Sequence, residues 1–207
     1  MECPNHPVHE NLRHVLSSKS PFIDLLTTAL DDHGCRVTIK ALRCDWPGNI
    51  RAAYISQSKS IVVCSQAFDN LSRRQSRKQL EYLITHELVH AFDDCRAKVD
   101  FHGNHEHLMC TEVRAASLSG ECMLKNNKLG VLLEKFTGFH EHCVKKSAIR
   151  SFMAMHPACG KEVALDVFNR VFHSCYNDFT PFDRVVLTDR QAKLAYRAYM
   201  TQYRYKL

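Results

Sequence analysis

The spacing of apolar residues changes near residue 75, and this change constrains the fold more than any other feature of the sequence. Before it lie three segments rich in β-favouring residues, with turns expected at 47–49 and 57–59: 36–42, 50–55 and 60–64. After it, apolar residues recur every three or four positions, as they do in helices. We therefore expect an α+β fold, with a small N-terminal sheet followed by a mostly helical C-terminal half.

Proline and glycine indicate where the first helix begins and ends. Residues 1–20 are polar and interrupted by prolines, so they are expected to form a loosely ordered arm. Ser20 and Pro21 are favourable N-cap and N1 residues, and the helix that they start should stop at Gly34. The other expected helices are one of about four turns from residue 75, then 108–122, 147–155, 161–175 and 189–203, with a loop at 99–107.

The helix that begins near residue 75 contains the sequence His86-Glu87-Leu88-Val89-His90, which matches H-E-x-x-H. Residues four apart lie on the same face of a helix, so both imidazoles point toward one place. Zinc accepts neutral imidazole nitrogens and keeps a position for water in catalytic sites. Glu87 can then accept a proton from that water and pass it to a leaving amine. The motif predicts a zinc metallopeptidase.

A catalytic zinc usually takes a third protein ligand, and Glu112 is the best candidate. It lies on the next expected helix, which could pack antiparallel to the first and bring one carboxylate to the metal. Three histidines of the intervening loop are alternatives: His102, His105 and His107.

The residues directly after the motif narrow the class of peptidase. Asp93 and Arg96 stand where the metzincin arrangement H-E-x-x-H-x-x-G-x-x-H needs glycine and histidine, so that arrangement is excluded. Asp93 lies one helical turn past His90, where it could accept the other N–H of that ligand.

The chain has 10 cysteines, spread along its length without any C-x-x-C pair. This spacing argues against a zinc ribbon or a thioredoxin-type site. Either the cysteines are reduced in a cytosolic protein or they form disulfides in an oxidising compartment, and their number favours disulfides. The opening residues lack the features of a secretory signal, so the route to such a compartment stays open.

Charge and hydropathy exclude several other classes. No apolar run approaches the roughly 18 residues that cross a bilayer, so the protein should be soluble or at most peripheral on a membrane. The formal net charge is +6, and the densest basic group, residues 73–78, is best explained as a solvated helix face. No zinc-finger, RNA-binding or basic-zipper pattern accompanies it, so a nucleic-acid partner is not expected.

Three blocks of sequence closely resemble one peptidase family. They are Thr-His-Glu-Leu-Val-His-Ala-Phe-Asp at 85–93, Val-Asp-Phe at 99–101, and Cys-Thr-Glu-Val-Arg-Ala-Ala-Ser-Leu-Ser-Gly-Glu-Cys at 110–122. The family is that of the mitochondrial inner membrane ATP-synthase-processing metallopeptidases, also called Ku-binding-protein metallopeptidases. Shorter matches extend the resemblance over residues 20–183: 34–35, 61–64, 143–148, 175–178 and 181–183.

The resemblance implies a zincin-like enzyme of the mitochondrial intermembrane space, held peripherally on the inner membrane. Such an enzyme matures a membrane subunit of ATP synthase and assists its assembly. His86 and His90 would be zinc ligands, Glu87 the catalytic residue and Glu112 the third ligand. The chain would divide into an arm (1–19), a metallopeptidase domain (20–183) and a C-terminal helical extension (184–207). An oxidising intermembrane space would also reconcile many disulfides with the missing secretory signal.

The sequence departs from the family pattern in two places. A C-x-x-C before the strand at residue 61 is replaced here by Cys44 alone, so the disulfide pairing can differ. Ala116 stands where related peptidases have an aspartate that supports the metal ligands.

Two other functions stay open: an assembly chaperone with a dispensable proteolytic site, and a nuclear DNA-repair partner, which would require reduced cysteines.

Overall fold

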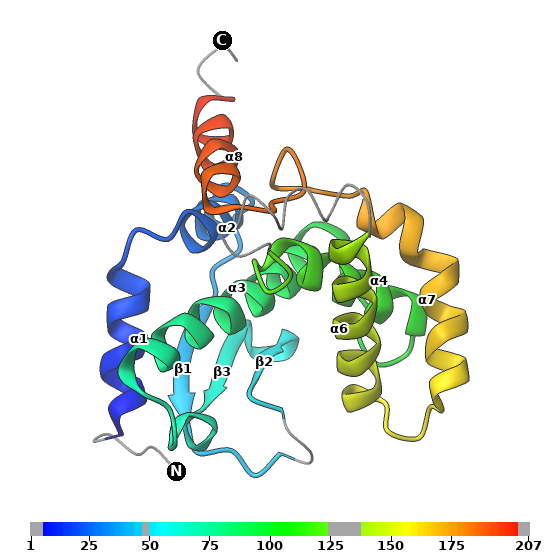
Figure 1. The fold of residues 1–207 in the computed structure, drawn as a ribbon, viewed down its shortest axis with the longest axis horizontal. Helices are drawn as coiled ribbons and strands as arrows, with labels where there is room; N and C mark the ends of the chain where they lie inside the picture. Colours follow the sequence, from blue (N-terminus) through cyan, green and yellow to red (C-terminus); the bar gives the residue numbers. More distant parts are fainter. Residues whose placement is uncertain (1–5, 47–49, 124–137, 203–207) are drawn as a thin grey trace. The chain divides into compact units, whose positions relative to one another are not determined.

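The computed structural model of the 207-residue chain describes residues 6–46, 50–123 and 138–202 (Figure 1). Cys3 and the turn predicted at 47–49 lie outside the described residues. The chain forms two compact units, Met1–Arg96 and Ala97–Leu207.

The first unit contains a three-stranded mixed sheet. Its strands are β1 (Thr38–Leu42), β2 (Ala52–Ile55) and β3 (Ser60–Cys64), in the order β1-β3-β2. β3 runs parallel to β1 and antiparallel to β2, with Ile39 and Tyr54 both opposite Ile61. Every residue of β3 is buried, as expected for a central strand that is covered on both faces. All three predicted strands are confirmed, and so is the α+β class.

The prediction of a loosely ordered N-terminal arm was wrong for residues 7–17. They form helix α1 (Pro7–Ser17), and its buried residues Val8, Leu12 and Val15 recur at helical spacing. Pro7 occupies the start of this helix, where its missing N–H costs nothing. The His6 Nδ1 atom accepts the Val8 N–H at 3.1 Å and caps the same end. A proline that looked like an interruption is therefore part of a helix start.

Helix α2 (Pro21–Asp32) begins as predicted, with Ser20 at the N-cap and Pro21 in the first turn. It ends before Gly34, whose φ of +72° is a conformation that glycine adopts without strain. Helix α3 (Arg73–Ala97) is longer than the predicted four turns and has 25 residues. Short 3₁₀ turns at Ser56–Ser58 and Ser65–Phe68 flank β3.

Helix α3 is fixed to the other elements of the first unit by side-chain bonds along its length. Near its start, the Asn11 amide of α1 donates to the Ser76 hydroxyl at 3.1 Å. One turn later, the Ser20 hydroxyl donates to the Glu81 carboxylate at 2.6 Å. Near its C-terminal end, Cys95 forms a disulfide with Cys35, which follows α2. These contacts hold the helix that carries the H-E-x-x-H motif at both ends.

The second unit is helical. It contains α4 (His105–Leu118), α6 (Phe139–Met155), α7 (Lys161–Tyr176) and α8 (Asp189–Thr201). Helices α4, α6 and α7 all pack against one another. The core between them is formed by small and large apolar residues of the three helices, among them Leu108, Met109, Val113, Val144, Phe152, Phe168 and Val171.

Two helices of this unit begin earlier than predicted. The Asn104 side chain accepts the N–H groups of Glu106 and His107, so α4 starts at His105 inside the predicted loop. Helix α6 starts at Phe139 instead of residue 147. Its first turns are polar, yet they include His140, which is completely buried. The predicted helices at 161–175 and 189–203 are confirmed over their described residues.

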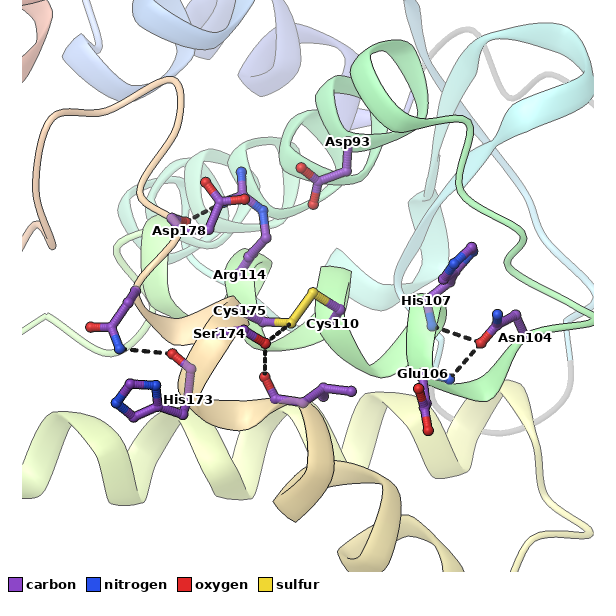
Figure 2. The surroundings of a disulfide bond; sticks show 12 residues. Asp93, Asn104, Glu106, His107, Cys110, Arg114, His173, Ser174, Cys175 and Asp178 are labelled. Carbon is purple, nitrogen blue, oxygen red and sulfur yellow. Dashed lines mark hydrogen bonds and ion pairs between the residues drawn. A yellow bond between two sulfur atoms is a disulfide. The ribbon is translucent and has the colours of Figure 1, made fainter.

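Contacts between distant residues hold the second unit together (Figure 2). The disulfide Cys110–Cys175 joins α4 to α7, and the disulfide Cys122–Cys143 joins the segment after α4 to α6. The guanidinium of Arg114, 1% exposed, forms an ion pair with Asp178 at 2.8 Å. It also donates to the backbone carbonyls of Asp178 and Thr180. Among the described residues, no helix combines the length and hydropathy needed to cross a membrane.

Candidate metal centre

The two histidines of the motif lie together on α3. Their ring centroids are 4.8 Å apart and the rings are inclined by 79°. The helix is fixed in rotation by its apolar stripe, since Leu80, Ile84 and Leu88 are all buried. Because four residues nearly complete one helical turn, this stripe determines where both imidazoles point.

In the described part of the chain, one group of three side chains has the composition and spacing of a metal site. It comprises His86, His90 and Glu112, whose potential ligand atoms all lie within 4.8 Å of one another. His90 is 7% exposed and Glu112 only 2%. A carboxylate buried to this degree is stable when it is paired or bound to a cation. Two imidazoles and one carboxylate are also a donor set found in catalytic zinc sites, so the residues present fit such an ion.

Glu87 is buried beside the first histidine and is held by the sheet. Its Oε2 atom accepts the backbone N–H of Tyr54 at 2.8 Å. Tyr54 belongs to β2, which lies at an edge of the three-stranded sheet. The bond therefore restricts the rotation of the Glu87 carboxylate, and Tyr54 sets its orientation.

The side chain of Tyr54 makes a second connection to α3. Its hydroxyl donates to the Asp94 carboxylate at 2.8 Å, and the Lys59 ammonium lies 2.6 Å from the same oxygen. Burial raises the pKa of the Tyr54 phenol, and the hydrogen bond to the Asp94 carboxylate adds to this effect. The phenol therefore stays protonated and keeps donating at any physiological pH. No sequence pattern indicated this contact, because β2 and α3 are distant along the chain.

The structure separates the alternatives for the third ligand. His107 accepts the Asp100 N–H at 3.3 Å, and His105 lies 3.9 Å from the Cys159 sulfur. Neither of them nor His102 belongs to the group formed by His86, His90 and Glu112. Asp93 accepts a hydrogen bond from Arg96 at 3.1 Å, and its predicted support of a ligand stays a prediction.

Comparison with known proteins bears on what this group of residues does. The model of the peptidase M76 family matches residues 8–183, which include the motif and Glu112. The chain belongs to the peptidase M76 family. The match begins at residue 8, earlier than the resemblance at 20–183, and it includes α1. The family resemblance that the motif blocks indicated is thereby confirmed.

Curated relatives of the chain carry a common name. This chain is 37% identical over 209 residues to the mitochondrial inner membrane protease ATP23 homolog of Xenopus laevis, covering 97% of this chain and 83% of that protein. The human protein of the same name is 36% identical over 190 residues, covering 90% of this chain and 73% of the human protein. The mitochondrial inner membrane protease atp23 of Schizosaccharomyces pombe is 36% identical over 178 residues, covering 85% of this chain and 91% of the yeast protein. No solved structure gave a significant match.

Proposed function

We propose that this M76 peptidase is a zinc-dependent endopeptidase of the mitochondrial intermembrane space, held peripherally on the inner membrane. Its client would be the precursor of an ATP-synthase membrane subunit, which it would mature and help to assemble. The names of the relatives support the compartment and the protease activity. The observation that carries the proposal is the buried Glu87 carboxylate, oriented by β2 and directly adjacent to His86 in a group suited to a metal ion.

The proposed chemistry assigns one task to each residue. His86, His90 and Glu112 would hold the zinc ion, which when bound polarises a carbonyl and makes water more acidic. Glu87 would accept the proton of the attacking water and deliver it to the leaving amine. The Tyr54 N–H holds the Glu87 carboxylate through Oε2 during both transfers. A carboxylate that is already oriented loses little conformational freedom when it reacts.

The proposed fold family is zincin-like, with the motif on α3 and a small sheet whose strand β2 bonds to Glu87. We keep the predicted boundaries, which separate an N-terminal segment that contains α1 (1–19), a metallopeptidase domain (20–183) and a C-terminal extension (184–207). Helix α8 lies within that extension.

The disulfides support an oxidising compartment. Eight cysteines form four pairs within the described residues: Cys35–Cys95, Cys44–Cys64, Cys110–Cys175 and Cys122–Cys143. Persistent disulfides are rare in the cytosol and nucleus, where thiols are kept reduced. They favour the intermembrane space over the nuclear DNA-repair alternative.

The second candidate function is an assembly chaperone in which proteolysis is dispensable. The intact Glu87 favours the peptidase, because a purely structural metal site needs no general base. The two functions can coexist in one protein, and a single substitution separates them.

Glu87→Gln tests the proposal. The amide oxygen can still accept the Tyr54 N–H, so the fold and the metal should be retained. The amide cannot accept a proton, and loss of general-base assistance should lower the proteolytic rate by roughly 10²–10⁴-fold. The matched control is Glu81→Gln, two turns earlier on α3, where an amide oxygen can still accept the Ser20 hydroxyl.

The readouts are metal content, precursor processing and ATP-synthase assembly in cells that carry only the variant. Slow processing with normal assembly would support a peptidase with a separate assembly role. Unimpaired processing by Glu87→Gln would show that Glu87 is not the base and would overturn the mechanism. Loss of assembly at normal protein level would show that both functions use the same site.

A further inference from the structure

Helix α8 presents a basic face to solvent. Its cations recur three or four residues apart, which places them on one side of the helix: Arg190, Lys193 and Arg197. All three are exposed, and Leu194, 39% exposed, lies between them on the same side. The other side of the helix is buried and so fixes this direction: Ala192, Ala195 and Tyr199. We refer to the three cations and Leu194 as the basic face of α8.

The charges of the basic face are not neutralised within the described residues. No carboxylate there lies within ion-pair distance of the three cations. Asp189, the one acidic residue of α8, lies in its first turn, where it complements the helix dipole. The basic group at the start of α3 is different, because Arg73 and Arg77 both lie within 4.0 Å of the Glu10 carboxylate. Helix α8 therefore carries the less compensated positive charge.

The basic face also lies outside the part of the chain that matches the family model. That model covers residues 8–183, and α8 begins at Asp189. No residue of the face belongs to the metal group formed by His86, His90 and Glu112. The face is therefore available for a contact other than catalysis, and relatives of the chain are named for the mitochondrial inner membrane.

Anionic phospholipid headgroups match this face in charge and in hydrogen-bonding geometry. A guanidinium binds phosphate oxygens through two parallel N–H groups, and a lysine adds a compact positive charge. Clusters of basic residues are attracted to anionic membrane surfaces, and apolar side chains among them reach the boundary of the acyl chains. Leu194 has the position for such a contact, which favours a lipid surface over a purely charged partner such as a nucleic acid.

We propose that the basic face of α8 binds anionic phospholipids of the inner membrane and holds the peptidase on the membrane surface. This inference rests on the peripheral location proposed above and names the side chains that produce it. Because the attraction is mainly electrostatic, it weakens when salt screens the charges. Binding at the surface keeps the enzyme near precursors of membrane subunits.

The test is co-sedimentation of the purified full-length protein with vesicles. One set contains phosphatidylcholine and cardiolipin, an anionic phospholipid, and the other contains phosphatidylcholine alone. The parent should bind the anionic vesicles and not the neutral ones, and added potassium chloride should release it. A single replacement of Arg190, Lys193 or Arg197 by glutamine should weaken binding about fivefold, and the triple replacement on the order of 100-fold.

The matched control removes the same charge from exposed positions of α1 and α3. It is Arg13→Gln/Arg74→Gln/Lys78→Gln, which should bind anionic vesicles like the parent. Arg204 and Lys206, which lie outside the described residues, are kept in every variant. Both triple variants should keep the circular dichroism spectrum of the parent and hydrolyse a soluble peptide at its rate, because none of the replaced residues belongs to the metal group.

Three outcomes would overturn the proposal. The first is equal vesicle binding by the two triple variants, which would mean that net charge alone decides it. The second is a parent that does not bind cardiolipin vesicles, even if its metal content and proteolysis are as proposed. The third is a parent that binds duplex DNA or polyglutamate more tightly than vesicles, which would assign the face to another acidic macromolecule. Normal processing by Glu87→Gln would overturn the catalytic mechanism and leave vesicle binding unaffected.

Discussion

The two histidine groups of this protein are assembled in opposite ways. His86 and His90 are four residues apart on one helix, and a single periodic stripe orients both. His105, His156 and Cys159 come from three segments, and only the packing of α4, α6 and α7 brings them together. The first group is a local feature and the second a product of long-range contacts.

This difference predicts how each group responds to mutation. A local pair survives small changes elsewhere, because its geometry is that of the helix itself. A long-range group depends on every contact that holds its segments in place. In the second unit these contacts include an ion pair, two disulfides and a buried histidine.

Removing a local ligand should abolish activity without unfolding the protein. His90→Ala should lose the metal because two protein ligands rarely hold a catalytic zinc. Proteolysis should fall by more than the roughly 10²–10⁴-fold that loss of the general base alone would cost. The control His105→Ala should keep both metal and activity. Stoichiometric zinc in His90→Ala, measured by atomic absorption, would refute the ligand assignment.

Removing a long-range ion pair should instead destabilise the second unit. Arg114→Met leaves the Asp178 carboxylate without its 2.8 Å partner and frees two backbone carbonyls. Asp178 is itself 32% exposed, so leaving its carboxylate and the two carbonyls without their buried donor should cost about 3 kcal/mol. The control is Arg170→Met, which removes an exposed pair with Glu106 and should cost about 0–1 kcal/mol. Equal urea midpoints for the two variants would contradict the structural role of Arg114.

His140 should make stability depend on pH. Its ring is buried, with Nδ1 2.7 Å from the Tyr176 hydroxyl, and burial lowers its pKa to about 4. The unfolded chain takes up this proton near pH 6.5, so stability is complete above that pH and falls as the pH drops toward 4.

The loss over that range should be on the order of 2–3 kcal/mol. It is measured as the difference between the parent and His140→Gln in urea unfolding at several pH values. The exposed His142→Gln should keep the slope of the parent. A parent and a His140→Gln variant with the same slope would show that folding does not lower the pKa of His140.

The smallest expected effect compares the two disulfides of the second unit. Cys110–Cys175 closes a separation of 65 residues and Cys122–Cys143 one of 21. If the bonds act by restricting the unfolded chain, loss of the bond that closes the longer loop should lower the free energy of unfolding by about 1 kcal/mol more than loss of the other. The pairs are replaced by alanine in turn, and unfolding free energies are compared. The opposite order would mean that native packing, rather than loop length, sets the contribution of each bond.

Much of the fold follows from the sequence. Segments rich in β-favouring residues predicted all three strands, and helical periodicity predicted α2, α3, α7 and α8. The arm was wrong because Pro7 was taken for an interruption, although proline is favoured in the first turn of a helix. The early start of α6 was missed because its first turns are polar, and their burial depends on the residues packed around His140.

For the proposed active site, the sequence determined the residues that are close along the chain. His86, Glu87 and His90 follow from one motif, because a helix fixes neighbours three and four residues apart. Glu112 was preferred to three nearby histidines because its helix could pack antiparallel to the motif helix, and the structure groups it with the motif. No pattern indicated that the Tyr54 N–H would hold Glu87, since that bond spans 33 residues.

The tertiary structure alone decided which distant residues meet. The ten cysteines suggested disulfides, yet nothing in their spacing predicted that Cys110 pairs with Cys175 or that Cys159 lies beside His105. Local preferences act through a few bonds, whereas long-range pairs form only when packing of the whole chain offsets the entropy of closing each loop. A sequence read by its local patterns therefore identifies the chemistry of the motif, and the folded chain determines what surrounds it.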